Sequence, residues 1–322
     1  MRIVFAGTPE PAVPSLEALV AAGHDVIGVV TRPDAPAGRG KKLTASPVAK
    51  RAEELGLEVV KPVHPRDPEF VDWLTAKAPD ACPVVAYGAL VPQNVLDIPT
   101  HGWLNLHFSL LPAWRGAAPV QRSIMAGDTV TGASVFELVK ELDAGPVYRT
   151  MTDQVAPLDT SADLLDRLAH SGAQLLVDVL ADIEAGVTPT EQSTEGITLA
   201  PKITVEETQI DWALPAATIG AMVRGANPNP GAWTMLDGQR FKVWLATPAT
   251  HDEALEAGQI VATKKQLLIG TGDGVLELLR VQAFGKKEMA GPDWARGMHE
   301  LPTSFDRPTS SDTVNTNDRA NA

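Results

Sequence analysis

The sequence has 322 residues, of which 44% are hydrophobic and 21% are charged, so it can bury a sizeable core and is long enough for two domains. Its single cysteine, Cys82, excludes an internal disulfide and a thiolate metal cluster, and no apolar run approaches the roughly 18 residues that span a bilayer. The net charge of -13 opposes binding to nucleic acid, although residues 32–66 carry eight basic and four acidic side chains.

The first half of the chain alternates short β-branched runs with helical patterns. Strands are predicted at 3–5, 26–30 and 84–87, and helices at 13–22 and 48–55. Continuous apolar strands separated by helices are typical of a parallel sheet that is covered on both faces. We therefore expect a doubly wound, mostly parallel α/β sheet. Because Met1–Gly7 leads into a turn rather than a signal-peptide core, we also expect a cytoplasmic protein.

The segment Trp103–His107 is predicted to form a further strand, with polar side chains near its end. Asn105 and His107 are two residues apart, so both point to the same face of the sheet. Asp143 follows an alternating, antiparallel pattern over 132–150, in a turn that can return it to the same crevice. Open α/β sheets place their ligands beyond the carboxyl ends of strands. An Asn, a His and an Asp in such positions can equally be ordinary structural residues, so the residue types alone do not decide the function.

The second half of the chain begins with a long helical pattern from Thr160 or Ser161 to Gly186, followed by a Thr-, Pro- and Glu-rich segment. Beyond it, one helix precedes five short strands, predicted at 232–236, 241–246, 259–262, 266–270 and 275–281. Their spacing favours a small OB-like β-barrel, although an open sandwich fits nearly as well. We expect an α/β domain at 1–188, a linker at 189–206, an OB-like domain at 207–300 and a disordered tail at 301–322.

Several motifs carry a resemblance to a known family. In the first domain they are Gly7-Thr8-Pro9-Glu10, Ala86-Tyr87-Gly88, Asn105-x-His107-x-Ser109-Leu110-Leu111-Pro112 and Leu142-Asp143-x-Gly145. In the second they are Ile210-Asp211-Trp212, Asn227-Pro228 with Pro230-Gly231-Ala232, and Gly285-Lys286-Lys287. Together they resemble the methionyl-tRNA formyltransferase family, over nearly the whole chain up to about Gly297. The Asn, His, Asp and Ser-Leu-Leu-Pro motifs also occur in other folate-dependent formyltransferases, whereas the second-domain motifs indicate the family that acts on tRNA.

The resemblance implies a reaction and its participants. A formyl group would pass from 10-formyltetrahydrofolate to the amino group of methionine on initiator tRNA, and no metal would be needed. We expect a monomer that does not bind membranes. Two other hypotheses remain open. One is the same chemistry on a small amine, such as an amino sugar nucleotide or glycinamide ribonucleotide, and the other is a non-catalytic RNA-binding protein on the same scaffold.

The resemblance also implies roles for individual residues. Asn105 and His107 would contact the formyl oxygen, and Asp143 would assist as a proton relay, with its carboxylate expected to raise the pKa of the imidazole. The folate is expected to contact Ser109, Leu110, Leu111, Pro112, Tyr87 and Gly88. The tRNA is expected to contact Arg39, Lys41 and Lys42 in a Gly-rich basic loop, together with Lys286 and Lys287. Departures from the family pattern at Phe108, Ala113 and Asn229 remove none of these candidates.

Overall fold

The computed structural model describes residues 1–37, 40 and 42–306, and the chain divides into two compact units. The first unit comprises residues 1–120, 130–155 and 163–202. The second comprises 121–129, 156–162 and the chain from Ile203 onward. Within the described residues, no helix combines the length and the apolar character that a membrane span requires.

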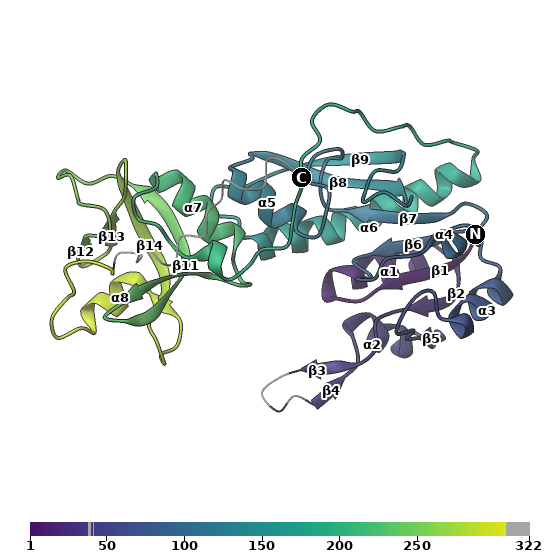
Figure 1. The fold of residues 1–322 in the computed structure, drawn as a ribbon, viewed down its shortest axis with the longest axis horizontal. Coiled ribbons are helices and arrows are strands. Elements are labelled where there is room, and N and C mark those ends of the chain that lie inside the picture. The colour runs from purple at the N-terminus through teal and green to yellow at the C-terminus, as the bar shows by residue number, and fades with distance from the viewer. Residues whose placement is uncertain (38–39, 41, 307–322) are drawn as a thin grey trace. The chain divides into compact units, whose positions relative to one another are not determined.

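The first unit is built on one seven-stranded sheet with the order β5-β2-β1-β6-β7-β8-β9 (Figure 1). The strands are β1 (Arg2–Gly7), β2 (Asp25–Val30), β5 (Val59–Val60), β6 (Cys82–Val85), β7 (Trp103–His107), β8 (Val130–Glu137) and β9 (Val147–Gln154). The first five pair in parallel, and β8 pairs antiparallel with both β7 and β9. Residues 3–6 of β1 are fully buried, as a central strand covered on both faces requires. The predicted mostly parallel sheet is therefore confirmed.

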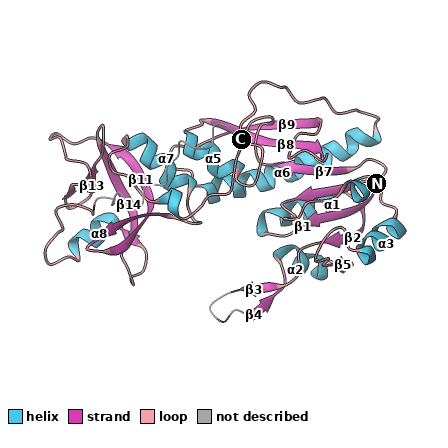
Figure 2. Cartoon of the chain, viewed as in Figure 1, coloured by secondary structure: helices cyan, strands magenta, loops and turns pink. Residues whose placement is uncertain are grey.

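Helices flank the strands of this sheet (Figure 2). The helical segments that lie in this unit or begin or end in it are η1 (Glu10–Ala12), α1 (Val13–Ala21), α2 (Pro47–Glu54), α3 (Pro68–Lys77), α4 (Gln93–Leu96), α5 (Pro119–Ala126) and α6 (Ser161–Glu184). Two glycines permit close helix packing, because a Cβ at Gly28 would lie 2.6 Å from the Trp73 ring and one at Gly172 would lie 3.0 Å from Leu106. Trp73 is on α3 and Leu106 is on β7, so α3 packs on β2 and α6 packs on β7.

A short hairpin that the sequence analysis did not predict lies within the basic loop. Strands β3 (Ala35–Ala37) and β4 (Lys42–Thr44) pair antiparallel, with Ala37 opposite Lys42. Figure 1 shows this hairpin projecting beyond α2. Lys42 is exposed at its tip, whereas Arg39 and Lys41 lie outside the described residues.

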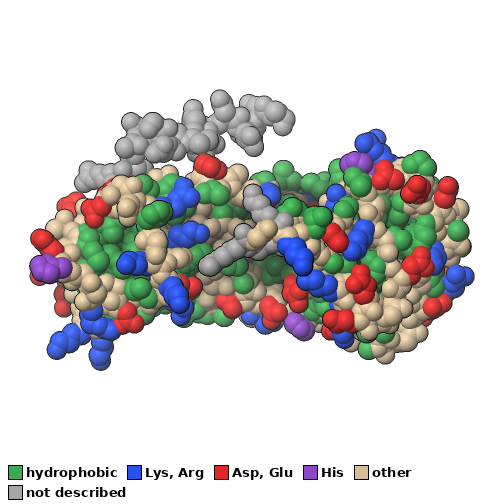
Figure 3. Space-filling model, turned by 90° about the horizontal axis from the view of Figure 1, so that it is seen from below, with side chains coloured by type: hydrophobic (Ala, Val, Ile, Leu, Met, Phe, Trp, Pro, Cys, Tyr) green, Lys and Arg blue, Asp and Glu red, His purple; other side chains and the backbone are tan. Residues whose placement is uncertain are grey.

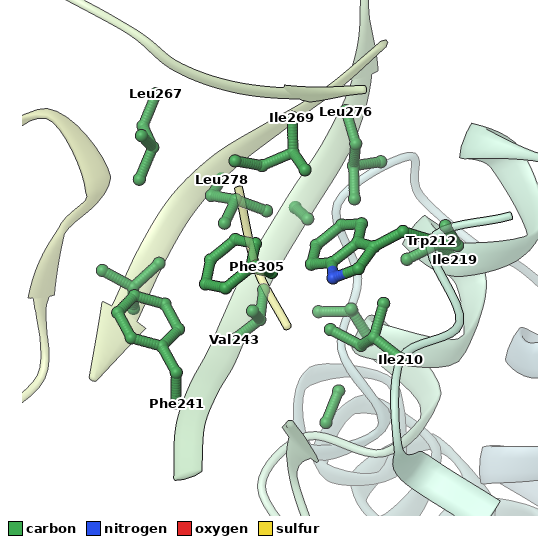
Figure 4. Close-up of a cluster of buried hydrophobic side chains, with 14 of the residues drawn as sticks. Ile210, Trp212, Ile219, Phe241, Val243, Leu267, Ile269, Leu276, Leu278 and Phe305 are labelled. Carbon is green, nitrogen blue, oxygen red and sulfur yellow. The ribbon is translucent and has the colours of Figure 1, made fainter. Parts of the chain in front are cut away.

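The described part of the second unit after Ile203 is an antiparallel β domain with helices and a 3-10 turn. Its elements are η2 (Glu206–Thr208), α7 (Ala216–Gly225), β10 (Ala232–Leu236), β11 (Gln239–Ala249), β12 (Ile260–Ala262), β13 (Leu267–Gly270), β14 (Val275–Gln282), β15 (Met289–Ala290) and α8 (Gly291–Arg296). The sheet order is β10-β11-β14-β13-β12, and β15 pairs with β14. All five strands expected from the sequence are therefore present. Their apolar side chains form one buried core with Trp212 and Ile219 of the segments that precede them (Figure 4).

The chain after residue 300 departs from the expected disordered tail as far as it is described. Phe305 is only 3% exposed and stacks on Trp212 with ring centroids 5.2 Å apart. The backbone amide of Phe305 donates to the carbonyl of Gly258, and that of Ile260 donates to Thr303. The expectation of disorder is therefore wrong for residues 301–306, because one buried aromatic ring and its flanking backbone bonds anchor a segment of polar composition. Residues 307–322 lie outside the described residues.

Replacing Phe305 by Ala tests this anchor. Truncating a buried Phe typically costs about 3–5 kcal/mol, so the free energy of unfolding of the second unit should fall by about that amount. Urea unfolding followed by tryptophan fluorescence measures it. The matched control is Phe284→Ala, since Phe284 is 66% exposed and its loss should change stability by less than about 0.5 kcal/mol. Equal effects of the two substitutions would contradict the anchoring role.

Candidate active site

Strand β7 places Asn105 and His107 on one face of the sheet. Leu104 and Leu106 alternate with them, and Leu106 meets α6 at Gly172 on the opposite face. Asn105 pairs in register with Val84 of β6 and with Phe136 of β8, so the strand is fixed from both sides. The predicted orientation of the two polar side chains follows directly from this pairing.

His107 is buried, and each of its ring nitrogens faces an oxygen atom. Its Nε2 lies 2.8 Å from the carbonyl oxygen of Trp114, and because a carbonyl can only accept, Nε2 carries the proton and donates. Its Nδ1 lies 3.9 Å from Oδ2 of Asp143, and its ring packs edge-on against Phe136. The structure therefore brings His107 and Asp143 together, although they are far apart in the sequence.

Burial lowers the pKa of His107 below its ordinary value. The carboxylate of Asp143 and the carbonyl of Trp114 act in the opposite direction, but they do not outweigh the loss of solvation. The Asp143 carboxylate raises the pKa of the imidazole, as expected, but burial lowers it by more. Burial therefore favours the uncharged imidazole, in which Nε2 carries the proton and Nδ1 faces Asp143.

Asp143 is held in an unusual backbone conformation. Its φ is +47°, in the left-handed region that costs a non-glycine residue about 1–2 kcal/mol. Its Oδ2 accepts a hydrogen bond of 2.7 Å from the amide of Gly116. Gly116 itself has a φ of +125°, and a Cβ there would lie 2.8 Å from the carbonyl of Ala200. Only a glycine fits at this position, and its amide holds the Asp143 carboxylate.

Asn105 differs from His107 and Asp143 in the state of its side chain. Among the described residues, none forms a hydrogen bond with the side-chain amide of Asn105, whereas its backbone is paired with β6 and β8. The side chain is half-buried on the same face as His107. A preformed amide donor without a protein partner is suited to binding an oxygen atom of a ligand.

The segment after β7 is a turn held by two serine hydroxyls. Oγ of Ser109 donates to the carbonyl of Ala113 at 2.6 Å. Oγ of Ser134 donates to the carbonyl of Ser109 and accepts from the amide of Leu111. Leu110, Leu111 and Pro112 are half-buried. These predicted folate contacts thus belong to a rigid turn next to the Asn105 face.

The loop after β6 contributes two further predicted folate contacts. The Tyr87 side chain is only 2% exposed and packs in a core cluster, while its carbonyl accepts a hydrogen bond from Thr8. Gly88 has a φ of +83°, and two residues later Leu90 is 87% exposed. The Tyr87 ring belongs to the core, which leaves the backbone of this loop and Leu90 available to a ligand.

The sequence analysis assigned no role to Gln192 and Thr198, since both lie in the segment expected to be a linker. Gln192 hydrogen-bonds Arg115 and the carbonyls of Asp143 and Gly145. Oγ1 of Thr198 accepts from the amide of Trp114 at 2.8 Å. Residues up to Lys202 belong to the first unit. No periodic pattern marks these residues, so only the structure reveals that this segment borders the site.

The basic residues predicted to contact tRNA lie in both units. Lys42 is exposed in the first unit, and Lys286 and Lys287 are exposed in the turn after β14 of the second. Nearby on β11, Arg240 lies over the Trp233 ring at 4.0 Å and Lys242 over the Trp244 ring at 4.7 Å. Figure 3 shows Lys and Arg side chains interspersed with acidic ones on the face in view. In the described parts of the chain, no group of three or more His, Cys, Asp or Glu residues is placed to hold a metal ion.

Comparison with known proteins identifies the family. Residues 1–180 match the formyl transferase family, and residues 202–299 match the family described as the formyl transferase C-terminal domain. The methionyl-tRNA formyltransferase of Streptomyces coelicolor is 58% identical over 299 residues, which cover 92% of this chain and 96% of the relative. The methionyl-tRNA formyltransferase of Thermobifida fusca is 54% identical over 298 residues, with the same coverage of both chains.

Solved structures share the fold at much lower identity. HypX from Aquifex aeolicus, solved in complex with tetrahydrofolic acid, is 20% identical with a TM-score of 0.64 over 91% of this chain, which spans about half (46%) of HypX. WlaRD, a sugar 3N-formyl transferase, is 15% identical with a TM-score of 0.66 over 89% of this chain and 99% of its own. These likenesses show the fold alone. Identity above 50% over nearly the whole length, together with both domain matches, places this chain in the methionyl-tRNA formyltransferase family.

Proposed function

We propose that this enzyme transfers the formyl group of 10-formyltetrahydrofolate to the amino group of methionine on initiator tRNA. The observation that carries the proposal is the meeting of Asn105, His107 and Asp143 on one face of the sheet, with the Asn105 amide uncommitted. The high identity to relatives named methionyl-tRNA formyltransferase supports the acceptor. The rigid turn 109–112 and the loop after β6 support the folate contacts at Ser109, Leu110, Leu111, Pro112, Tyr87 and Gly88. Leu90 joins them as an apolar contact.

The chemistry follows from the uncharged state of His107. As the amine nitrogen attacks the formyl carbon, a new C–N bond forms and the formyl oxygen gains negative charge. The Asn105 amide donates to that oxygen, where one such donor is typically worth about 10²–10³ in rate. The unprotonated Nδ1 of His107 takes the proton that the amine loses, and the resulting imidazolium is stabilised by Asp143 at 3.9 Å. The proton then passes to the folate nitrogen as its bond to the formyl carbon breaks.

The RNA contacts are proposed on charge and exposure. Lys42 of the hairpin and Lys286 and Lys287 of the second unit are exposed cations, which suits contact with phosphates. Arg39 and Lys41, from the same basic loop as Lys42, are proposed from the sequence. We further propose that the enzyme works as a cytoplasmic monomer.

The direct test is transfer of labelled formyl from 10-formyltetrahydrofolate to methionyl initiator tRNA. Methionyl elongator tRNA, free methionine, glycinamide ribonucleotide and an amino sugar nucleotide serve as parallel acceptors. Product on the initiator tRNA alone is expected. Transfer to a small amine without any tRNA product would overturn the proposed acceptor, and no transfer to any acceptor would overturn the proposed reaction.

Replacing Asn105 by Ala should lower kcat about 100- to 1,000-fold, because the donor to the developing oxyanion is lost. Steady-state kinetics at saturating folate and tRNA measure the effect. Asn94→Ala is the matched control, since Asn94 is exposed on α4 and should leave kcat unchanged. Near-normal turnover of the Asn105 variant would remove it from the proposed mechanism.

The pKa of His107 should show the opposing effects of burial and of the Asp143 carboxylate. Its pKa in the free enzyme should lie below about 6.5, the ordinary value for histidine. In Asp143→Asn the pKa should fall further, because the carboxylate that favours the charged imidazole is gone. NMR titration of the imidazole Cε1 proton, assigned with a His107→Gln variant, measures both values. Asp182→Asn, whose carboxylate pairs with Arg149, is the control and should not move the pKa. A pKa that rises in Asp143→Asn would contradict this account.

A further inference from the structure

Gln192 uses both ends of its side-chain amide next to the proposed catalytic residues. Its Nε2 donates to the carbonyls of Asp143 and Gly145, both at 2.8 Å. Its Oε1 accepts from Nε and Nη2 of Arg115 at 3.1 and 2.6 Å. One side chain therefore joins the turn that carries Asp143 to the turn that follows β7.

The turn that carries Asp143 has a strained backbone, which needs stabilising contacts. Asp143 has a φ of +47°, and a strained residue of this kind persists only where the surroundings fix it. The amide of Gly116 fixes the carboxylate end of Asp143, whereas Gln192 fixes its backbone carbonyl. At Gly145, a Cβ would lie 1.8 Å from the carbonyl of Glu137, so the turn is also closely packed. The backbone of Asp143 and its side chain are thus held by two different partners.

We propose that Gln192 is a positioning residue, which keeps the Asp143 carboxylate beside Nδ1 of His107 through hydrogen bonds to the Asp143 turn. The inference rests on the proposed function of Asp143. The role requires an amide, because only Asn and Gln present a donor pair and an acceptor on one planar group. A carboxylate in its place keeps the acceptor for Arg115 and loses both donors to the Asp143 turn.

The segment that carries Gln192 is bound to the first unit independently of that side chain. Thr190 and Val147 exchange two backbone hydrogen bonds, of 2.7 and 2.9 Å. Thr198 accepts at its carbonyl from Arg115, and Ala200 bonds both Arg115 and Ala118 through its backbone. Loss of the Gln192 donors should therefore leave the segment docked. This separates the positioning of Asp143 from the attachment of the segment.

The test compares Gln192→Glu with the double variant Glu191→Gln/Gln192→Glu. Glu191 is exposed, so the double variant restores the net charge of the segment without restoring the lost donors. In both variants kcat should fall about 10- to 100-fold, as expected when a reacting group shifts by a fraction of an ångström to 1 Å. The KM values for folate and tRNA should stay within about twofold, and Glu191→Gln alone should leave kcat unchanged. Melting temperatures identify any variant that is unfolded at the assay temperature.

A fall in kcat at constant KM in both Gln192 variants supports the inference. Normal kcat in Gln192→Glu overturns it, and so does a loss that the double variant restores, since added charge would then be the cause. If Gln192→Glu does not fold, the neutral and nearly isosteric Gln192→Met replaces it, and near-normal kcat again overturns the inference. If the unaltered enzyme forms no formylmethionyl-tRNA, the proposed function fails, which is a separate result.

Discussion

The backbone of Trp114–Gly116 is the constraint on which the site depends. Its Trp114 carbonyl fixes the ring of His107, and its Gly116 amide holds the Asp143 carboxylate. Trp114 has a φ of +61°, a conformation that costs a non-glycine residue about 1–3 kcal/mol. Thr198 stabilises it by accepting from the Trp114 amide, and a parallel bridge between Arg115 and Leu199 continues the same attachment. Two proposed catalytic side chains from distant parts of the sequence therefore take their positions from three consecutive residues.

This constraint also shapes the chemistry. In the proposed reaction Nδ1 of His107 is the nitrogen that takes up a proton, because Nε2 donates to the Trp114 carbonyl, and Nδ1 faces the Asp143 carboxylate. Burial lowers the pKa of the imidazole, which favours its uncharged form. In the proposed reaction the Asp143 carboxylate stabilises the imidazolium that forms. The site is organised in advance by fixed dipoles and one charge, which is how proteins stabilise charge that appears only during a reaction.

Much of this arrangement follows from local sequence rules. The two-residue spacing of Asn105 and His107 gives a shared face in any strand, and the alternation after Gly132 predicts the antiparallel strands that lead to Asp143. Other features depend on contacts that no local pattern encodes. Gln192 and Phe305 lie in segments of polar composition, and each is fixed by long-range partners. The pKa of His107 depends on a balance between burial and charge that residue types cannot weigh. The family resemblance identifies candidate residues, but only the three-dimensional structure shows which backbone groups hold them in place.

The path of the chain between α6 and the second unit has a consequence for dissection of the enzyme. The family match to the first domain ends at residue 180, whereas bonds to the site continue through Gln192, Thr198 and Ala200. A fragment that ended at 188 would keep Asn105, His107 and Asp143 and lose the partners that hold their turns. Proteolysis should have a similar effect. A cut at an exposed peptide bond such as Ser193–Thr194 would impair the proposed reaction without removing any proposed reacting group. A fragment that keeps these contacts has to include Gln192, Thr198 and Ala200, and the first unit itself extends to Lys202.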